Sequence, residues 1–208
     1  MAGRAVVNVH ERVLAAGEEE VGALVDSLAA GPADRLWPVS GWPAMVLRPG
    51  LEVGAAGGHG PVRYTVAAYV PGRWVRFAFT GPRGFDGFHE CTVHRADGGR
   101  TVLRHTLAMH ARGPALLSWP LLFRPLHDAL IEDAMDRAER ACTGAVARPV
   151  RWSPLVRLLR RALRAGARQG VSGVGGRRGE GVRPPCAGRE RMAVRPTRSG
   201  GVPADLGC

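Results

Sequence analysis

PVRYTVAAYVPGRWVRFAFTGPRGFDGFHECTVHRADGGRTVLRHTLAMHA, residues 61–111, contains four strand-like runs separated by turn signals at 71–72, 81–84 and 97–99. Apolar residues alternate with polar ones in each run, which predicts an antiparallel meander with one buried and one solvated face. The predicted buried face carries Val62, Tyr64, Val66, Ala68, Val75, Phe77, Phe79, His89, Cys91, Val93, Leu103, His105, Leu107 and Met109.

Before the meander, the chain predicts a strand followed by a helix. Val7, Val9 and Val13 alternate with Asn8, His10 and Arg12, a pattern typical of a strand with one buried face. Glu18 to Glu20 then supply the negative charge that favours a helix start, and this helix should end near Gly31-Pro32. Residues 33–61 give no clear assignment, apart from a short strand at 44–47 and a flexible, glycine-rich connection or lid at 54–60.

After the meander, a connection punctuated by proline (113–125) leads to a long amphipathic helix over residues 126–142. Its apolar stripe is rich in alanine, which predicts either close packing on the sheet or space for another molecule. The apolar stripe consists of Leu130, Ile131, Ala134, Met135, Ala138 and Cys142. The polar side of the helix consists of Asp128, Glu132, Asp136, Glu139 and Arg140.

Net charge divides the chain. Residues 1–144 contain fifteen Arg and fifteen acidic residues, so the whole net charge of +11 arises from residues 145–208. We therefore expect one neutral domain at 1–144, a basic amphipathic helix at 145–169, and a disordered tail rich in Gly, Pro and Arg at 170–208. The basic charge says nothing about partners of the domain itself.

Motifs for several other protein classes are missing from the sequence. The four Cys show no CxxC spacing, so neither a zinc ribbon nor a disulfide framework is predicted. No GxSxG, P-loop or dinucleotide fingerprint occurs, and we expect no cofactor. The N-terminus lacks a signal-like apolar run, and no run is long enough to span a membrane. These features favour a cytoplasmic protein, with membrane-peripheral contact as an alternative.

The order strand, helix, antiparallel strands and long C-terminal helix resembles the α+β helix-grip fold of the SRPBCC (START/Bet v 1-like) superfamily. The runs GHGPVRYTVAAYVPGRWVRFAF, GFHECTV, TVLRHTLAM and WPLLFRPLHDALIEDAMDRAE are similar to its polyketide cyclase/dehydrase-like branch. The resemblance covers residues 5–143. It implies a curved sheet wrapped around the long helix, with a hydrophobic cavity between them for a lipid, sterol, polyketide or similar molecule. Carriers, sensors and a minority of enzymes share this fold.

The candidate site consists of the residues on the faces that would enclose such a cavity. His105 and His127 are the candidate general acid or base, because the pKa of imidazole lies near neutral pH. A purely structural role for each of these side chains is the alternative. The candidate ligand-binding residues are Tyr64, Val66, Phe77, Phe79, His89, Leu107, Met109, Leu130, Ile131 and Ala134.

Other titratable residues are expected to take no part in this site. His59, His94 and His110 fall at turns or on the wet side of strands, and Asp128 and Glu132 on the polar side of the helix. The spacings of His89, His105 and His127 match no metal motif, so no metal site is predicted.

Three functions follow from these features. The first is binding of a hydrophobic small molecule, and the second is a metal-independent cyclase or dehydratase in which Tyr64 orients a carbonyl. The third is a membrane-surface adaptor that uses the Arg-rich segment 152–168 on anionic lipid. Docking of this segment on the protein's own domain and a lack of structure are the alternatives. Nucleic acid is an unlikely partner, because Trp152 is the only aromatic residue of that segment.

Overall fold

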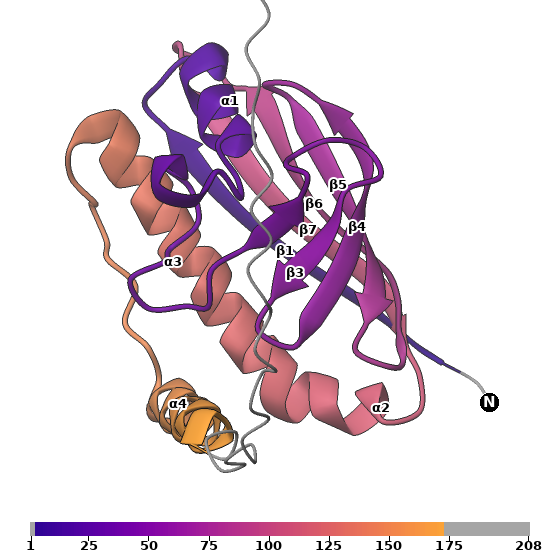
Figure 1. Ribbon diagram of the computed structural model, residues 1–208. Helices are drawn as coiled ribbons and strands as arrows, with labels where there is room; N and C mark the ends of the chain where they lie inside the picture. Colours follow the sequence, from indigo (N-terminus) through magenta and orange to yellow (C-terminus); the bar gives the residue numbers. More distant parts are fainter. Residues whose placement is uncertain (1–2, 173–208) are drawn as a thin grey trace, which may run out of the picture.

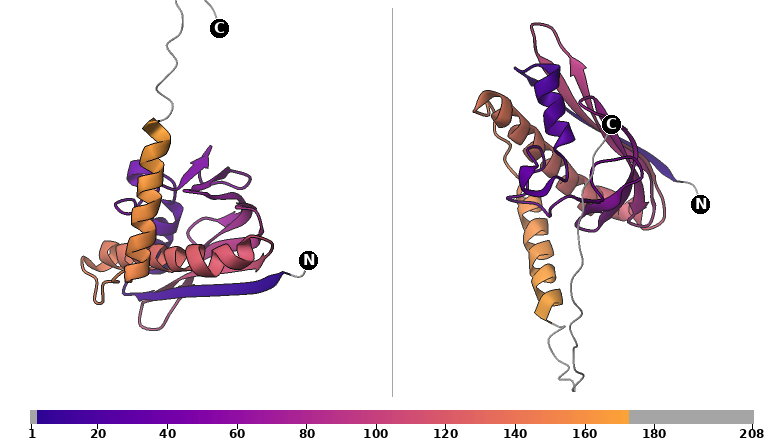
Figure 2. Two further views of the ribbon diagram at one scale, coloured as in Figure 1. Left: turned by 90° about the horizontal axis from the view of Figure 1, so that it is seen from below. Right: turned by 45° about the horizontal axis from the view of Figure 1, so that its top comes forward.

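The computed structural model describes residues 3–172, with side chains described for residues 3–163 (Figure 1). Seven antiparallel strands form one sheet in the order β1-β7-β6-β5-β4-β3-β2. The long helix α3 lies across the concave face of this sheet (Figures 1 and 2). The strands are β1 (Arg4–Leu14), β2 (Val46–Arg48), β3 (Ala56–His59), β4 (Val62–Val70), β5 (Trp74–Gly81), β6 (Phe85–Arg95) and β7 (Thr101–Ala111).

The predicted α+β helix-grip architecture, a curved sheet around a long helix, is confirmed. Helix α1 (Glu18–Asp26) follows β1 and packs against β6 and α3. Strands β4 to β7 form the predicted meander, with neighbouring strands paired along the chain. Helix α3 covers Arg124–Thr143 and ends at Gly144, which adopts the left-handed conformation that favours glycine at this position.

Two segments differ from the prediction. The glycine-rich segment 54–60 is not a lid or a plain connection, because it contains β3, which pairs with β2 and β4. A Cβ atom on Gly57 would lie 1.9 Å from the carbonyl oxygen of Val46, so glycine allows these strands to approach. The segment 113–125 is helical, with α2 (Ala115–Ser118) and a π-helical turn (Trp119–Phe123) leading directly into α3. Pro114 is the N-cap residue of α2, and Pro120 and Pro125 lie at the first two positions of the helical segments that follow, where proline is tolerated.

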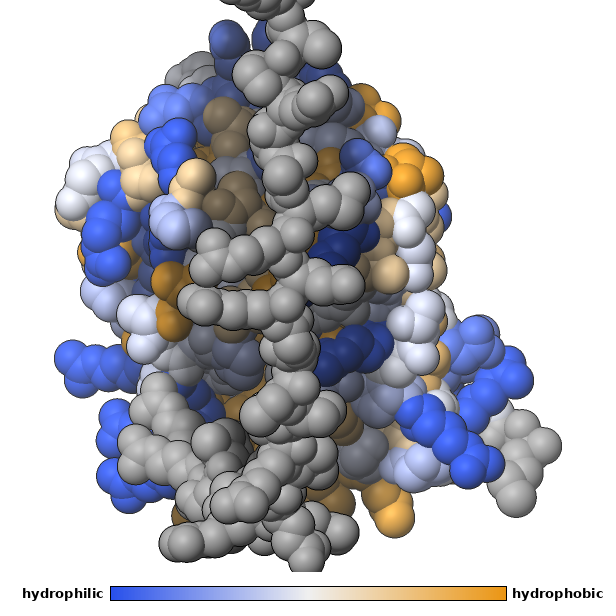
Figure 3. Space-filling model, viewed as in Figure 1, coloured by the Kyte–Doolittle hydropathy of each residue, from blue (hydrophilic) through white to orange (hydrophobic). Residues whose placement is uncertain are grey.

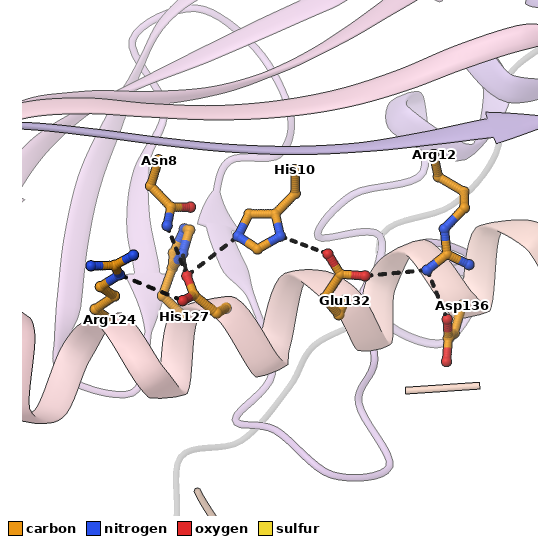
Figure 4. A network of polar contacts seen from close by, with 8 residues as sticks. Asn8, His10, Arg12, Arg124, His127, Glu132 and Asp136 are labelled. Atoms are coloured by element: carbon orange, nitrogen blue, oxygen red, sulfur yellow. Dashed lines mark hydrogen bonds and ion pairs between the residues drawn. The ribbon is translucent and has the colours of Figure 1, made fainter. Parts of the chain in front are cut away.

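Strand β1 buries its polar face, contrary to the usual pattern for a half-buried strand. Val7, Val9 and Val13 are 72%, 50% and 52% exposed. Asn8, His10 and Arg12 instead point toward α3 (Figure 4). The predicted polar side of α3 is therefore not turned entirely to solvent, because its acidic residues contact this face of β1. Alternation predicts that the two faces of a strand differ, but the neighbouring helix decides which face is buried.

The apolar interior has two parts. The larger cluster lies among the sheet, α1 and α3 and includes Leu14, Leu24, Phe77, Leu103 and Ala138. A smaller cluster joins the ends of β6 and β7 to α2, and its members are Phe85, Leu107, Met109, Ala111, Ala115 and Trp119. On the face drawn in Figure 3, hydrophilic and hydrophobic residues are interspersed outside the grey atoms.

Helix α4 (Pro154–Ser172) docks on the domain through a small aromatic cluster. The Arg160 guanidinium lies 4.4 Å from the ring centre of Trp42 and 3.8 Å from that of Trp152. Both indole N–H groups donate to Asp133 on α3. The basic helix predicted at 145–169 thus begins at Pro154. The predicted disordered tail lies, from residue 173 on, outside the described residues. In the described part of the chain, no helix has the length and apolar character needed to span a membrane.

Candidate functional site

A cavity of about 140 Å³ lies between the sheet and α3. Its walls are largely apolar, and the alanine in the stripe of α3 leaves room for it. The lining comes from α3, β5 to β7, the segment 119–123 and the segment 36–62. The lining residues include Trp37, Trp42, Met45, His59, Val62, Phe77, Phe79, Phe85, His89, Leu103, His105, Trp119, Phe123, His127, Leu130, Ile131, Ala134 and Met135.

Three histidines form a continuous row along one wall of this cavity. His89 on β6 and His105 on β7 are neighbours, with Nδ1 of His89 3.3 Å from Nε2 of His105. The ring of His127 on α3 lies 5.1 Å from that of His105, measured between ring centres. Alternation in the strands and the helical period of α3 place all three on faces that meet, although they are far apart in sequence.

Burial keeps these imidazoles neutral. The pKa values of His89 and His105 lie well below the usual value, first because burial disfavours the charged form and then because other histidines are near. The pKa of His127 is also lowered by burial and by His10, with Asp128, whose Oδ1 lies 3.5 Å from Nδ1 of His127, acting in the opposite direction. Each ring therefore offers one N–H donor and one acceptor nitrogen at neutral pH.

Several of these polar atoms have no hydrogen-bond partner among the described residues. They are Nε2 of His89, Nδ1 of His105, both ring nitrogens of His127 and the hydroxyl of Tyr64. A buried polar group without a partner costs about 1–3 kcal/mol, so native proteins normally satisfy it. The cavity therefore combines apolar walls with unpaired imidazole groups that suit a ligand with polar substituents.

Most of the predicted site residues lie at the cavity, but four do not. The lining contains Phe77, Phe79, His89, His105, His127, Leu130, Ile131 and Ala134. Tyr64 is fully buried and packs beside His89, with ring centres 4.9 Å apart, behind the lining residues. Val66 belongs to the main core, and Leu107 and Met109 to the smaller cluster. The structure thus gives no support to Tyr64 as the group that orients a substrate carbonyl.

His59 is the clearest omission from the predicted site. It was expected in solvent, yet it lines the cavity and its ring lies 4.7 Å from that of Trp37, measured between ring centres. Burial, with smaller effects from His127 and Arg63, lowers the pKa of His59 to about 3. His59 lies between glycines, so the sequence around it shows no alternation of apolar and polar residues that would predict its burial. Only the fold of segment 36–62 over the sheet brings His59 inward.

A network of charged groups lies beside His127, between β1 and α3 (Figure 4). The two ring nitrogens of His10 contact Glu132 Oε1 at 2.7 Å and Asp128 Oδ1 at 3.3 Å. The Asn8 amide donates to the same Asp128 oxygen at 2.9 Å. Asp128 and Glu132 lie on the predicted polar side of α3, and their carboxylates complement the polar face of β1.

The charges in this network stabilise one another. Burial lowers the pKa of His10, but hydrogen bonds and charge attraction from Asp128 and Glu132 outweigh burial and raise it above the usual value. Burial raises the pKa of Asp128, but its contacts with His10, His127 and Asn8 outweigh burial and lower that pKa. His10 is therefore charged under conditions in which His89, His105 and His127 are neutral.

Comparison with known proteins shows similarity in structure only. No family model and no curated protein sequence matches the chain. The truncated norcoclaurine synthase from Thalictrum flavum superposes with a TM-score of 0.50 and 15% identity, covering 65% of this chain and 93% of that one. XoxI from Bacillus cereus gives a TM-score of 0.49 with 11% identity over 68% and 96% of the two chains. CalU16 from Micromonospora echinospora gives 0.48 with 12% identity over 78% and 94%.

At these identities the likeness concerns the fold and not the activity. The strand order, the long helix across the concave face and the superposition on norcoclaurine synthase lead to one conclusion. The chain has an α+β helix-grip fold like that of norcoclaurine synthase, which is the fold that the resemblance to the SRPBCC (START/Bet v 1-like) superfamily implied.

Proposed function

We propose that this protein binds a small, mainly apolar molecule of about one ring that carries at least one hydrogen-bonding group. The observation that supports this proposal is the apolar cavity with unpaired imidazole nitrogens on its wall. Apolar walls supply affinity, and a few polar groups fix the orientation of the ligand.

The size of the cavity favours a smaller ligand than a sterol or an extended polyketide. An engineered protein cavity of about 150 Å³ binds benzene, and this cavity of about 140 Å³ is similar in size. A longer molecule needs more room than the lining leaves, and the segment 36–62, the turn 119–123 and α4 are the parts of the lining outside the sheet and α3 that could move outward to supply it.

Binding is testable with a matched set of probes: benzene, phenol, benzoate and, as a long-chain comparison, palmitate. We expect phenol or benzoate to bind more tightly than benzene, because each can pair with an imidazole. Ala134→Phe places a ring in the cavity and should weaken binding at least about tenfold. Ala141→Phe, at an exposed position on the same helix, is the control.

Isothermal titration calorimetry on the wild type and both variants gives the affinities, and circular dichroism checks that each variant is folded. His105→Gln should weaken phenol more than benzene. Equal binding of all probes to wild type and Ala134→Phe would show that they bind elsewhere, and tighter binding of palmitate would contradict the size argument.

A cyclase or dehydratase is the second candidate, favoured by His105 and His127 lying together at the cavity wall. Either neutral imidazole can accept a proton from a substrate carbon next to a carbonyl. Their lowered pKa makes them weak bases, which is why binding is the first proposal. Turnover of a poly-β-keto substrate, lost in His105→Ala and His127→Ala while binding is retained, would support the enzyme, and no turnover by the wild type would exclude it for that substrate.

Membrane-surface contact is a third candidate, favoured by one side of α4. Leu155 and Leu158 are exposed beside Arg157 and Arg161, a combination that suits an anionic lipid surface. The variant Leu155→Ser/Leu158→Ser should reduce co-sedimentation with vesicles of phosphatidylserine and phosphatidylcholine. The same result for wild type and variant would remove this candidate.

A further inference from the structure

The histidine and carboxylate groups between β1 and α3 have the composition and spacing of a metal site. His10, His127 and Asp128 each bring one ligand atom to a place where all three atoms lie within 4.8 Å of one another. His10 Nε2 and Asp128 Oδ1 are 3.3 Å apart, and His127 Nδ1 and Asp128 Oδ1 are 3.5 Å apart. Ligands bound at 2.0–2.1 Å in a tetrahedron are separated by about 3.4 Å. Two of the three separations therefore already match.

We propose that His10, His127 and Asp128 bind a divalent first-row transition-metal ion, with Zn²⁺ as the reference case. The ligand atoms are His10 Nε2, His127 Nδ1 and Asp128 Oδ1. Two imidazoles and one carboxylate suit Zn²⁺ and its neighbours, whereas Mg²⁺ and Ca²⁺ prefer oxygen ligands only. Since His127 also lines the cavity, an ion at this site lies at the cavity wall.

The surroundings of the three ligands support this assignment. Glu132 Oε1 lies 2.7 Å from Nδ1 of His10, the nitrogen that does not face the site. A carboxylate in this place fixes the orientation of a metal-binding imidazole and makes it a stronger ligand. Glu132 is therefore a positioning residue, and it is held in turn by Arg12 at 3.2 Å.

Unpaired atoms beside the site provide a second, independent observation. Both ring nitrogens of His127 and Oδ1 of Asn8 are buried without a hydrogen-bond partner among the described residues. Nδ1 of His127 lies 3.5 Å from Oδ1 of Asp128, and the Asn8 amide nitrogen donates to the same oxygen, so both residues lie beside the proposed ion. An ion pair between His10 and the two carboxylates explains the contacts of His10, but it gives Nδ1 of His127 only a long contact with Asp128, at 3.5 Å. A metal ion bound to Nδ1 satisfies that atom.

The experiment is titration of the full-length protein, freed of metal by chelation, with Zn²⁺ and with Co²⁺. We expect one ion to bind per chain, and this binding should require His10, His127 and Asp128. Bound Co²⁺ should show the visible absorption band of a Co²⁺ ion with few nitrogen and oxygen ligands. Asp128→Asn should weaken binding more than Glu132→Gln, for which about a 10- to 100-fold loss is expected. Glu132→Gln should keep the shape of the Co²⁺ spectrum, since it removes no ligand.

His94→Gln is the matched control, because His94 is an exposed histidine on β6. The affinity of this variant for Zn²⁺ and Co²⁺ should equal that of the wild type. Imidazole nitrogen signals in NMR spectra of the wild type give a readout that needs no variant: Zn²⁺ should shift the signals of two histidines strongly. The inference is overturned if no stoichiometric binding occurs, if Asp128→Asn binds as tightly as the wild type, or if two such imidazole signals do not shift. Binding of phenol or benzoate is measured separately, so this result and the proposed ligand function can fail independently.

Discussion

Of the seven histidines, His59, His89, His105 and His127 are held neutral by burial, while His10 is held charged by two carboxylates. An unfolded chain treats all of them alike, with a pKa near 6.5. The folded chain therefore separates identical side chains into two classes by environment alone. This separation makes the stability of the protein depend on pH.

The free energy of unfolding should fall as the pH is lowered from about 6.5 toward 4. In this range the unfolded chain protonates its histidines, whereas His59, His89 and His105 stay neutral in the folded state, so the unfolded state binds more protons. Each buried histidine contributes a slope of at most about 1.4 kcal/mol per pH unit. His10 opposes this trend, because its raised pKa adds stability that is fully present at low pH and is lost as the pH rises through the folded pKa.

His89→Phe tests this reasoning, since it removes one buried imidazole and retains an aromatic ring. Urea unfolding at several pH values gives the slope of the unfolding free energy against pH. For His89→Phe this slope should correspond to about one proton fewer taken up on unfolding than in the wild type. His94→Gln, at an exposed position, should leave the slope unchanged. An identical slope for His89→Phe and wild type would contradict the neutral, buried state of His89.

Arg12 connects β1 to three carboxylates of α3. Its guanidinium is 3.2 Å from Glu132 and 3.0 Å from Asp136, and it also pairs with Glu139. Arg12→Met should lower the free energy of unfolding by about 1–3 kcal/mol, because Asp136 is buried and loses its charged partner. Arg104→Met removes the exposed pair with Glu11 and should cost less than about 1 kcal/mol. Chemical denaturation of both variants measures the difference, and equal losses would contradict it.

At the scale of elements, β1 shows how an edge strand takes its orientation from a helix. It pairs with β7 alone, and one of its faces meets the acidic side of α3. The valines on the other face remain exposed, so they contribute to strand propensity more than to the core.

Substitutions at two positions of β1 should therefore differ sharply. Val9→Thr, on the exposed face, should change the free energy of unfolding by no more than about 0.5 kcal/mol. Leu14→Ala, at the fully buried end of the same strand, should lower it by about 2–5 kcal/mol. Denaturation curves compare the two, and a large loss for Val9→Thr would indicate that the valine face is covered in solution.

At the scale of the whole molecule, α4 is tied to the cavity end of the domain through one carboxylate. Trp42 lies in the segment before β2, and Trp152 lies just before α4. Both indole N–H groups donate to Asp133 of α3. Leu163 of α4 also belongs to the cavity lining. The attachment of α4 and the lining of the cavity therefore share Trp42, which also contacts Arg160 of α4.

Asp133→Ala should loosen α4 without unfolding the domain. A hydrogen bond to a charged group contributes about 1.5–3 kcal/mol, so amide hydrogen exchange in residues 156–163 should become about 10- to 100-fold faster. Exchange in the central strands β6 and β7 should stay near that of the wild type. Asp97→Ala, in an exposed turn, is the control, and unchanged exchange in α4 for Asp133→Ala would contradict this attachment.

The sequence by itself determined the meander of residues 61–111, the long helix and the overall architecture. Strand alternation, turn residues and helical periodicity are local signals, so they can be recognised without knowing which elements pack against each other. The same signals place His89, His105 and His127 on faces directed at a common interior. They also identified Leu130, Ile131 and Ala134 on the helix stripe.

Only the tertiary structure decided which side of β1 is buried, that His59 lines the cavity, and that Asp128 and Glu132 face His10. The pairs joining β1 to α3 are separated by about 120 positions in the chain. A polar face becomes an inner face when charges of opposite sign cover it, and nothing within a single strand or helix records that partner. Burial of polar groups is a property of pairs of elements, whereas secondary structure is largely a property of each element alone.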